Sequence, residues 1–296
     1  MSTQTHAHDA GKYYVPHSSH WPIVGSISLF ILMWGAVALL NEWGPGWVML
    51  PGALAIAYLF FGWFRTVIAE NQAGMYNLDV DKSFRMGMIW FIASEVLFFA
   101  VFFGALFYTR ELAIPWLSGE GVKIFNKLLI WQNYDAAWPT NGPAAIGGHA
   151  DGTFETIPAF GLPAINTAIL LTSGVTITIA HHALKAGNRG VLKIFLALTF
   201  LLGFAFVGLQ AEEYHHAYTE LGLKLSTGIY GSTFFMLTGF HGLHVTIGAI
   251  MLLVIWLRVM RGHFTPTHHF AFEATAWYWH FVDVVWLGLF IFVYWL

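Results

Sequence analysis

The stretch that decides the fold is Met86-Gly-Met-Ile-Trp-Phe-Ile-Ala-Ser-Glu95-Val-Leu-Phe-Phe-Ala-Val-Phe-Phe-Gly-Ala-Leu-Phe-Tyr108, in which Glu95 is the single charged residue. A helix of about 20 apolar residues crosses the hydrocarbon core of a bilayer. A run of this length and composition therefore predicts a membrane-spanning helix.

Six further stretches have the same character, so we predict an all-α membrane protein with seven spans. The spans are Pro22–Leu40, Trp47–Ile68, Met86–Tyr108, Leu162–Ala183, Val191–Ala211, Ile229–Leu257 and Ala274–Leu296. Pro22, Pro51 and Pro163 lie near helix starts, where the missing N–H has no partner to lose.

The composition agrees with this class, since 57% of the residues are hydrophobic and 10% are charged. Soluble domains carry about 25% charged residues. A net charge of −3 gives no reason to expect a nucleic-acid partner, and the absence of cysteine excludes disulfides and thiolate metal sites. The polar N-terminal tail lacks the apolar core of a signal peptide.

The distribution of Lys and Arg predicts a cytoplasmic N-terminus and a C-terminus outside. With that orientation the inner segments hold Lys12, Arg65, Lys82, Arg85, Lys185, Arg189, Lys193, Arg258 and Arg261. The outer segments hold Arg110, Lys123, Lys127 and Lys224, together with most of the carboxylates, Glu212 and Glu213 included.

Two polar segments interrupt the spans. Asn71–Ser83 predicts a connection between a two-helix hairpin (residues 1–78, with the tail) and a five-helix bundle (residues 79–296). Glu111–Phe160 predicts a long outer loop, and loops of this length tend to be functional or to contact partners.

Glu95 lies ten residues into its span, near the middle of the bilayer. A charged carboxylate there costs several kcal/mol, so we expect it to be protonated, paired or reached by water. Either it takes part in proton transfer, or it is a structural group that is hydrogen-bonded to Ser94 or to a neighbouring helix.

Histidines share faces with other polar groups on the last two spans. His280 and Asp283 are three residues apart, as are His241 and His244. Imidazole nitrogens of this kind bind haem or copper in some proteins and hydrogen-bond neighbouring helices in others. The structural role is favoured because no other soft ligand is near.

The predicted inner face is also rich in histidine, which titrates near neutral pH and can collect protons at a membrane surface. The residues are His6, His8, His17, His20, His181, His182, His263, His268 and His269. Glycines on the sixth span, from Gly228 to Gly248, predict close helix packing.

Five sequence runs together resemble cytochrome c oxidase subunit III, over nearly the whole chain from Tyr14. They are Phe91-Ile-Ala-Ser-Glu95-Val-Leu-Phe-Phe, Ser173-Gly-Val-Thr-Ile-Thr-Ile-Ala-His-His182-Ala-Leu, Tyr230-Gly-Ser-Thr-Phe-Phe, Thr238-Gly-Phe-His-Gly-Leu-His244-Val, and His268-His-Phe-Ala-Phe-Glu273-Ala-Thr-Ala-Trp-Tyr-Trp-His-Phe-Val-Asp283-Val-Val-Trp. The last run is long enough to be highly specific.

The resemblance implies a subunit without a catalytic centre in a proton-pumping oxidase that reduces oxygen to water. Its implied partners are catalytic subunit I, which carries the haem and copper, subunit II, and indirectly cytochrome c. The family's two-helix and five-helix parts enclose a lipid-filled cleft. The subunit is expected to sustain proton uptake and to protect the complex from inactivation during turnover, and no metal site is expected in this chain.

The resemblance also assigns residues. Glu95 matches the family's buried, carbodiimide-reactive carboxylate. Trp63, Arg65 and Phe91 match phospholipid contacts on one wall of the cleft, and Arg258 and His263 match contacts on the other. Ala69 departs from the pattern, because relatives often have a second arginine there.

The long 111–160 loop favours a bacterial cytoplasmic membrane over a mitochondrial one, and the presence of the first two spans favours cytochrome c over quinol as the donor. Two other classes of function remain open from sequence. One is an independent proton-coupled transporter that uses Glu95 and Asp283, and the other is a haem-binding redox protein.

Overall fold

The computed structural model describes residues 13–16 and 18–296, and it divides into two compact units, Met1–Met86 and Gly87–Leu296. Each unit is described by itself. The predicted proton-collecting residues His6, His8 and His17 lie outside the described residues, so nothing is said of their structure.

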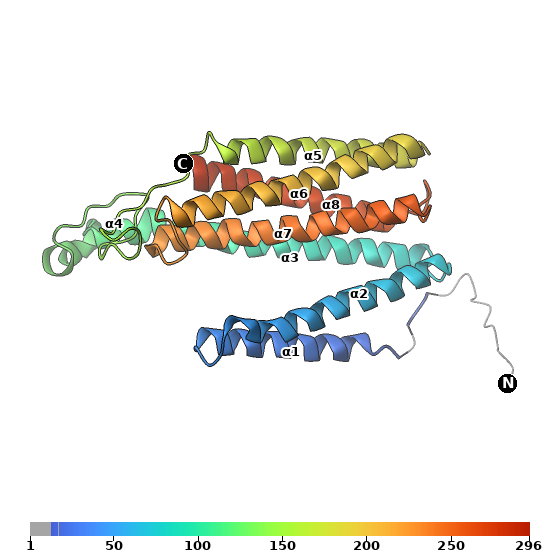
Figure 1. Cartoon of the computed structure of the whole chain (residues 1–296), viewed down its shortest axis with the longest axis horizontal. Coiled ribbons are helices and arrows are strands. Elements are labelled where there is room, and N and C mark those ends of the chain that lie inside the picture. The colour runs from blue at the N-terminus through green and yellow to red at the C-terminus, as the bar shows by residue number, and fades with distance from the viewer. Residues whose placement is uncertain (1–12, 17) are drawn as a thin grey trace. The chain divides into compact units, whose positions relative to one another are not determined.

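All secondary structure in the described residues is helical, and seven helices are long and apolar enough to cross a membrane, which confirms the predicted fold class (Figure 1). The principal helices are α1 (Trp21–Leu40), α2 (Leu50–Gln72), α3 (Leu78–Tyr108), α5 (Leu162–Lys185), α6 (Arg189–Thr219), α7 (Gly228–Met260) and α8 (Phe270–Leu289). Short segments are η1 (Gly46–Met49), η2 (Thr109–Ala113), α4 (Ile114–Leu117), η3 (Gly121–Lys123), η4 (Asn126–Ile130) and η5 (Phe290–Trp295).

In the first unit, α1 and α2 form an antiparallel hairpin whose backbones approach closely at glycine. A Cβ atom on Gly52 would collide with the backbone of Leu32, and one on Gly62 would collide with the ring of Trp21. Pro22 and Pro51 lie in the first turns of the two helices, as predicted. Small residues therefore hold this hairpin together, as is common where lipid supplies no hydrophobic drive.

The connection after the hairpin is shorter than the predicted segment Asn71–Ser83. The helix α2 continues to Gln72 and α3 begins at Leu78. Asn77 makes the early start possible, because its side-chain oxygen accepts hydrogen bonds from the backbone N–H groups of Asp79 and Val80 (3.2 and 3.0 Å). Polar residues of the first turn of α3 are thus helical, although hydropathy alone marks them as a connection.

In the second unit, α5 to α8 and the remainder of α3 pack side by side (Figure 1). The centre of the packing is Trp279, which is 0% exposed. Cβ atoms built on Gly203 and Gly248 would lie 2.6 and 2.8 Å from its ring, so only glycine leaves room for the indole. The indole N–H of Trp279 donates to Ser173 Oγ (2.8 Å) and thereby joins α8 to α5.

The helix α6 extends two turns beyond the predicted end at Ala211, so Glu213, counted above among the outer carboxylates, belongs to this helix. Glu213 is 1% exposed. Its Oε1 accepts hydrogen bonds from Tyr294 Oη (2.6 Å) and from the amide of Gln210 (3.2 Å). Glu213 Oε2 and Gln210 Oε1 are buried and have no hydrogen-bond partner among the described residues, so these bonds satisfy only part of the cluster.

The predicted outer loop is partly ordered against the bundle rather than free of it. It begins with short helical segments, η2 to η4, and then runs without regular structure to α5. The backbone N–H of Tyr230 donates to the carbonyl of Thr140 (3.2 Å), and the Tyr230 ring contacts the rings of Trp138 and Phe154. The loop therefore covers the start of α7.

Candidate functional site

Glu95 on α3 lies against His244 on α7, which lies beside it in the second unit (Figure 1). The carboxylate Oε2 is 2.9 Å from Nε2 of the imidazole, and Nδ1 of the same ring is 2.6 Å from the backbone carbonyl of Phe240. Ser94 bonds instead to the carbonyl of Phe91 (2.6 Å). Of the two structural partners predicted for Glu95, the neighbouring helix is therefore the one that it contacts.

The two bonds of His244 fix how many protons the pair holds. A carbonyl oxygen only accepts, so Nδ1 carries a proton. The 2.9 Å contact between Nε2 and Oε2 then contains one more proton, which either makes the histidine an imidazolium or makes the glutamate a carboxylic acid. Both forms have zero net charge, so the pair avoids the cost of an isolated charge in the membrane.

Asp283 and His280 share a face of α8, as the sequence spacing predicts, and that face meets α5. The carboxylate Oδ2 of Asp283 is 3.7 Å from Nδ1 of His280. A Cβ on Gly174 would lie 2.5 Å from the same oxygen, so the backbone of α5 packs directly against the carboxylate where a side chain would not fit. The other oxygen, Oδ1, is buried and has no hydrogen-bond partner among the described residues.

The three histidines considered as haem or copper ligands do not converge on one point. His241 is 0% exposed, its Nε2 donates to the carbonyl of Val282 (3.2 Å), and its ring contacts Trp286. His244 is paired with Glu95, and His280 contacts Thr178 (3.3 Å). Their arrangement matches hydrogen bonding between helices and gives no shared ligand set.

Arg258, predicted to contact lipid, lies in the last turn of α7. It is 7% exposed, its guanidinium lies 4.5 Å from the centre of the Phe264 ring, and Nε and Nη2 have no partner among the described residues. His263 follows in the connection to α8. Its pKa is lowered by burial and then by the positive charges of Arg258 and Arg261. The end of α7 therefore combines positive charge with buried side-chain nitrogens that have no partner among the described residues.

The other predicted lipid contacts are at the surface of their own units. Trp63 and Arg65 are exposed on α2, and Trp63 is 45% exposed. Phe91 is 46% exposed on α3 and stacks on Tyr278 of α8 (6.2 Å between ring centres). His20 is exposed next to Trp21 at the start of α1.

Sequence reasoning missed Glu213 because it lies beyond the apolar window. The only available signal is its spacing from Gln210, which puts both side chains on one face of a helix. The third partner, Tyr294, is 81 residues away and comes into contact through the packing of α6 on the end of the chain.

Comparison with known proteins places the chain in a family. Residues 11–130 and 123–296 match the family described as cytochrome c oxidase subunit III. A cytochrome c oxidase subunit 3 from Dugong dugon is 41% identical over 296 residues, covering 100% of this chain and 99% of the relative. Those from Oryctolagus cuniculus and Carassius auratus are 40% and 41% identical over 296 and 290 residues, with at least 98% of each chain covered.

Proposed function

The chain belongs to the cytochrome c oxidase subunit III family, and from this premise we propose that it is a structural, lipid-binding subunit without a redox centre of its own. As an oxidase subunit it assembles with the other oxidase subunits, one of which holds the haem and copper. In that complex it binds phospholipid, sustains proton uptake by the catalytic subunit and protects the complex from inactivation during turnover.

The roles of the buried polar groups support a subunit without a catalytic centre. The Glu95–His244 pair is neutral, and the hydrogen bonds that its two side chains make are within α3 and α7. His241 and His280 are each engaged separately. Hydrogen bonds of this kind between neighbouring helices support a structural role for these groups.

The observation that carries the lipid proposal is the pair of unpartnered N–H groups on buried Arg258. A buried arginine that lacks an anion is costly. At the same helix end, His263 adds a ring nitrogen that can donate, and Arg261 adds positive charge. A lipid phosphate satisfies this site, and the exposed apolar side chain of Phe91 in the same unit suits an acyl chain. The lipid-filled cleft of the family stays a prediction.

Replacing Arg258 tests the proposal. We expect Arg258→Gln to keep much of the packing on Phe264 while removing a headgroup charge partner worth about 1 kcal/mol. The variant oxidase should lose phospholipid, measured by mass spectrometry of extracted lipid, and its oxygen consumption should decline faster during continuous turnover.

The matched control is Lys185→Gln, which removes an exposed charge at the same end of the bundle. It should leave lipid content and turnover lifetime unchanged. Unchanged lipid content and lifetime in Arg258→Gln would contradict the proposal. A variant that keeps its lipid yet inactivates quickly would separate the protective role from lipid binding.

Assembly with the catalytic subunit has its own support. Around Asp283 the surface between α5 and α8 is hollowed and mostly apolar, with Val175 59% and Val284 67% exposed. The chain should copurify in equal amounts with the haem-containing subunit. A stable lone chain in mild detergent, with no haem protein attached, would count against this role.

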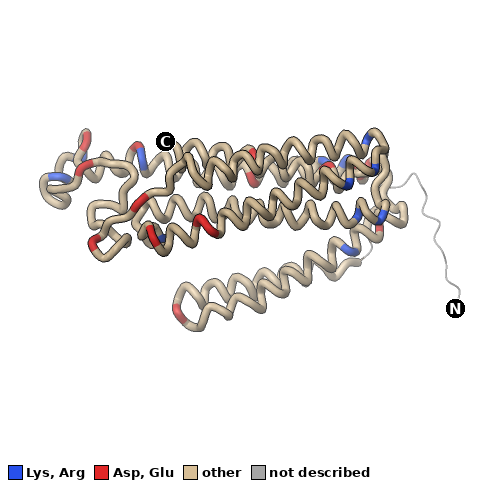
Figure 2. Tube along the Cα trace, turned by 45° about the horizontal axis from the view of Figure 1, so that its top comes forward, with Lys and Arg blue, Asp and Glu red and all other residues tan. Residues whose placement is uncertain are grey.

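We also propose the orientation that the charges favour. In the second unit, Lys and Arg gather where α5 and α7 end and α8 begins (Figure 2). The positive-inside rule puts this end in the cytoplasm, in a bacterial inner membrane, with the C-terminus outside. Exposed His20 would then face the cytoplasm, where it can collect protons for the complex.

A further inference from the structure

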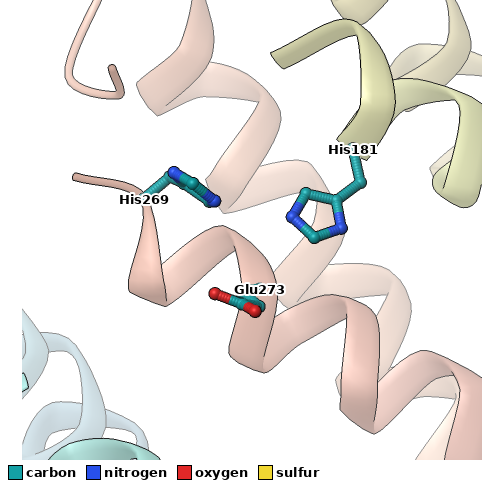
Figure 3. A group of neighbouring side chains, drawn as sticks. All are labelled: His181, His269 and Glu273. Carbon is teal, nitrogen blue, oxygen red and sulfur yellow. The ribbon is translucent and has the colours of Figure 1, made fainter. Parts of the chain in front are cut away.

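Two histidines and a glutamate meet at the end of the second unit where α5 ends and α8 begins. His181 belongs to the last turns of α5, His269 directly precedes α8, and Glu273 is in the first turn of α8. One potential ligand atom from each residue lies within 4.8 Å of the other two. Figure 3 shows the two imidazole rings turned toward each other, with the carboxylate on the α8 side.

The hydrogen bond of His269 prepares this ring to bind a metal ion. Its Nδ1 lies 3.1 Å from the backbone carbonyl of Thr265 and therefore carries the proton. The lone pair of Nε2 is left for a ligand. Metal-binding histidines in proteins are held in this way, with the second nitrogen donating to a carbonyl or a carboxylate.

His181 supplies the second observation. Its Nε2 is buried and has no hydrogen-bond partner among the described residues. Leaving a buried polar nitrogen unpaired costs about 1–3 kcal/mol, and such atoms in native proteins usually have a partner that has not been seen. The ring is packed against Phe272 (5.6 Å between centres), so it does not turn freely toward water.

The surrounding contacts hold the connection that carries His269 against α6 and α8. Arg189, at the start of α6, donates to the carbonyl of Phe264 in the connection that leads to α8. Phe264 and Phe272 are 1% exposed and pack edge to face. The ligand residues are thus mounted on packed elements rather than on a free loop, as a preorganised site requires.

From this geometry we propose that His181, His269 and Glu273 bind a divalent transition-metal ion of the zinc type and thereby tie α5 to α8. Two imidazoles and one carboxylate form a known zinc ligand set, with a fourth position open to water or to a partner group. Hard ions such as Ca²⁺ prefer sites built from oxygen alone. Tetrahedral zinc needs donors about 3.3 Å apart, so the three ligand atoms, which lie within 4.8 Å of one another, move closer together when the ion binds.

The sequence gives each ligand histidine its own control. His182 and His268 are the neighbours of His181 and His269 in sequence, and both are exposed outside the cluster. Purified oxidase containing this chain is stripped with a chelator, titrated with Zn²⁺ and analysed for bound metal. Wild-type complex should retain one more zinc ion than His181→Gln or His269→Gln, while His182→Gln and His268→Gln should match wild type.

Two further measurements test the same proposal: the zinc affinity of a variant that lacks the Glu273 ligand, and the binding of a different ion. Loss of groups that only orient ligands weakens metal sites about 10–100-fold, so loss of the Glu273 ligand in Glu273→Gln should weaken binding by about 100-fold or more. A Ca²⁺ titration should show no occupancy that depends on these three residues. Equal zinc content in wild type and in both ligand variants would overturn the proposal.

A second measurement needs no variant and so does not depend on their folding. Histidine-specific acylation of the wild-type complex, read by peptide mass spectrometry, should be slowed by Zn²⁺ at His269 and unchanged at His268. Equal labelling of His269 with and without Zn²⁺ would also overturn the proposal. Neither measurement uses oxygen consumption, so the result is independent of the subunit's role in turnover.

Discussion

Each unit of the molecule contains a tryptophan that fits over glycine and donates to a hydroxyl group, but the two sites differ in what surrounds them. In the hairpin, Trp21 sits over Gly62 and its indole N–H donates to Thr66 (3.1 Å). In the bundle, Trp279 fills the space left by Gly203 and Gly248. The same contact, a tryptophan packed on glycine, thus occurs at the edge of a two-helix unit and at the centre of a multi-helix unit.

The share of buried residues shows what this difference means. Only 11% of the apolar window of α1 or α2 is buried, and α3 has the same share, whereas the spans from α5 to the end of the chain are 33% to 50% buried. The hairpin is therefore held by a single helix contact and leaves most of its surface to lipid or partners. The bundle makes polar contacts inside its own core and depends less on what lies outside.

Trp279→Ala should have the largest effect and tests this contrast directly. Truncating a buried tryptophan costs about 3–5 kcal/mol, because the cavity cannot be refilled. Trp21→Ala should cost clearly less, since lipid or neighbouring side chains can fill the space at the edge of a hairpin. Thermal unfolding of the purified complex, followed by the solubility of this chain, measures both. Equal destabilisation would show that the hairpin is packed as tightly as the bundle.

Glu95 distinguishes a structural polar contact from a proton-transfer site. Glu95→Gln should leave oxygen reduction and most proton pumping intact, because the amide N–H can donate to Nε2 of His244 in place of the carboxyl proton. Glu95→Ala should cost more, about 1–3 kcal/mol, because it leaves His244 unpaired in the bundle.

Steady-state oxygen consumption and protons released per electron, measured on both variants, decide between the two roles. Loss of proton release in Glu95→Gln with oxygen consumption preserved would identify Glu95 as a transfer site, and the structural assignment would then be wrong.

Tyr76→Phe should have the smallest effect and is confined to the hairpin. The hydroxyl of Tyr76 donates to Glu70 Oε2 (2.6 Å) at the end of α2, and Tyr14 donates to Oε1 (3.0 Å). Losing one such bond costs about 0.5–1.5 kcal/mol. Hydrogen exchange of the end of α2 should accelerate in Tyr76→Phe and less so in Tyr13→Phe, whose bond to Ser83 is exposed.

The pH dependence of this contact follows from the tyrosine. Burial and then the bond to Glu70 raise the pKa of Tyr76. The contribution of the Tyr76–Glu70 hydrogen bond to stability is therefore complete below the ordinary tyrosine pKa of about 10. It is lost as the pH rises toward the raised pKa of Tyr76. The difference in exchange between wild type and Tyr76→Phe should shrink above about pH 10. A constant difference at higher pH would contradict the assignment.

The seven spans could be predicted from sequence because the hydrocarbon core requires a minimum apolar length of any helix that crosses it. Pro22, Pro51 and Pro163 all lie in first turns. Helix ends beyond the hydrocarbon were not predictable from hydropathy. The capping by Asn77 and the extra turns around Glu213 depend on hydrogen bonds, and apolar windows do not register these.

The sequence by itself determined that this chain is a seven-span membrane protein and that Glu95 needs a partner, since both follow from the cost of polar groups in lipid. Only the tertiary structure decided which partner that is. Glu95 and His244 are 149 residues apart in the sequence, and Tyr294 and Glu213, which also form a hydrogen bond, are 81 residues apart. Helix periodicity orders side chains within one helix, whereas contacts between helices depend on how glycines and large rings fit together, as Gly203, Gly248 and Trp279 do.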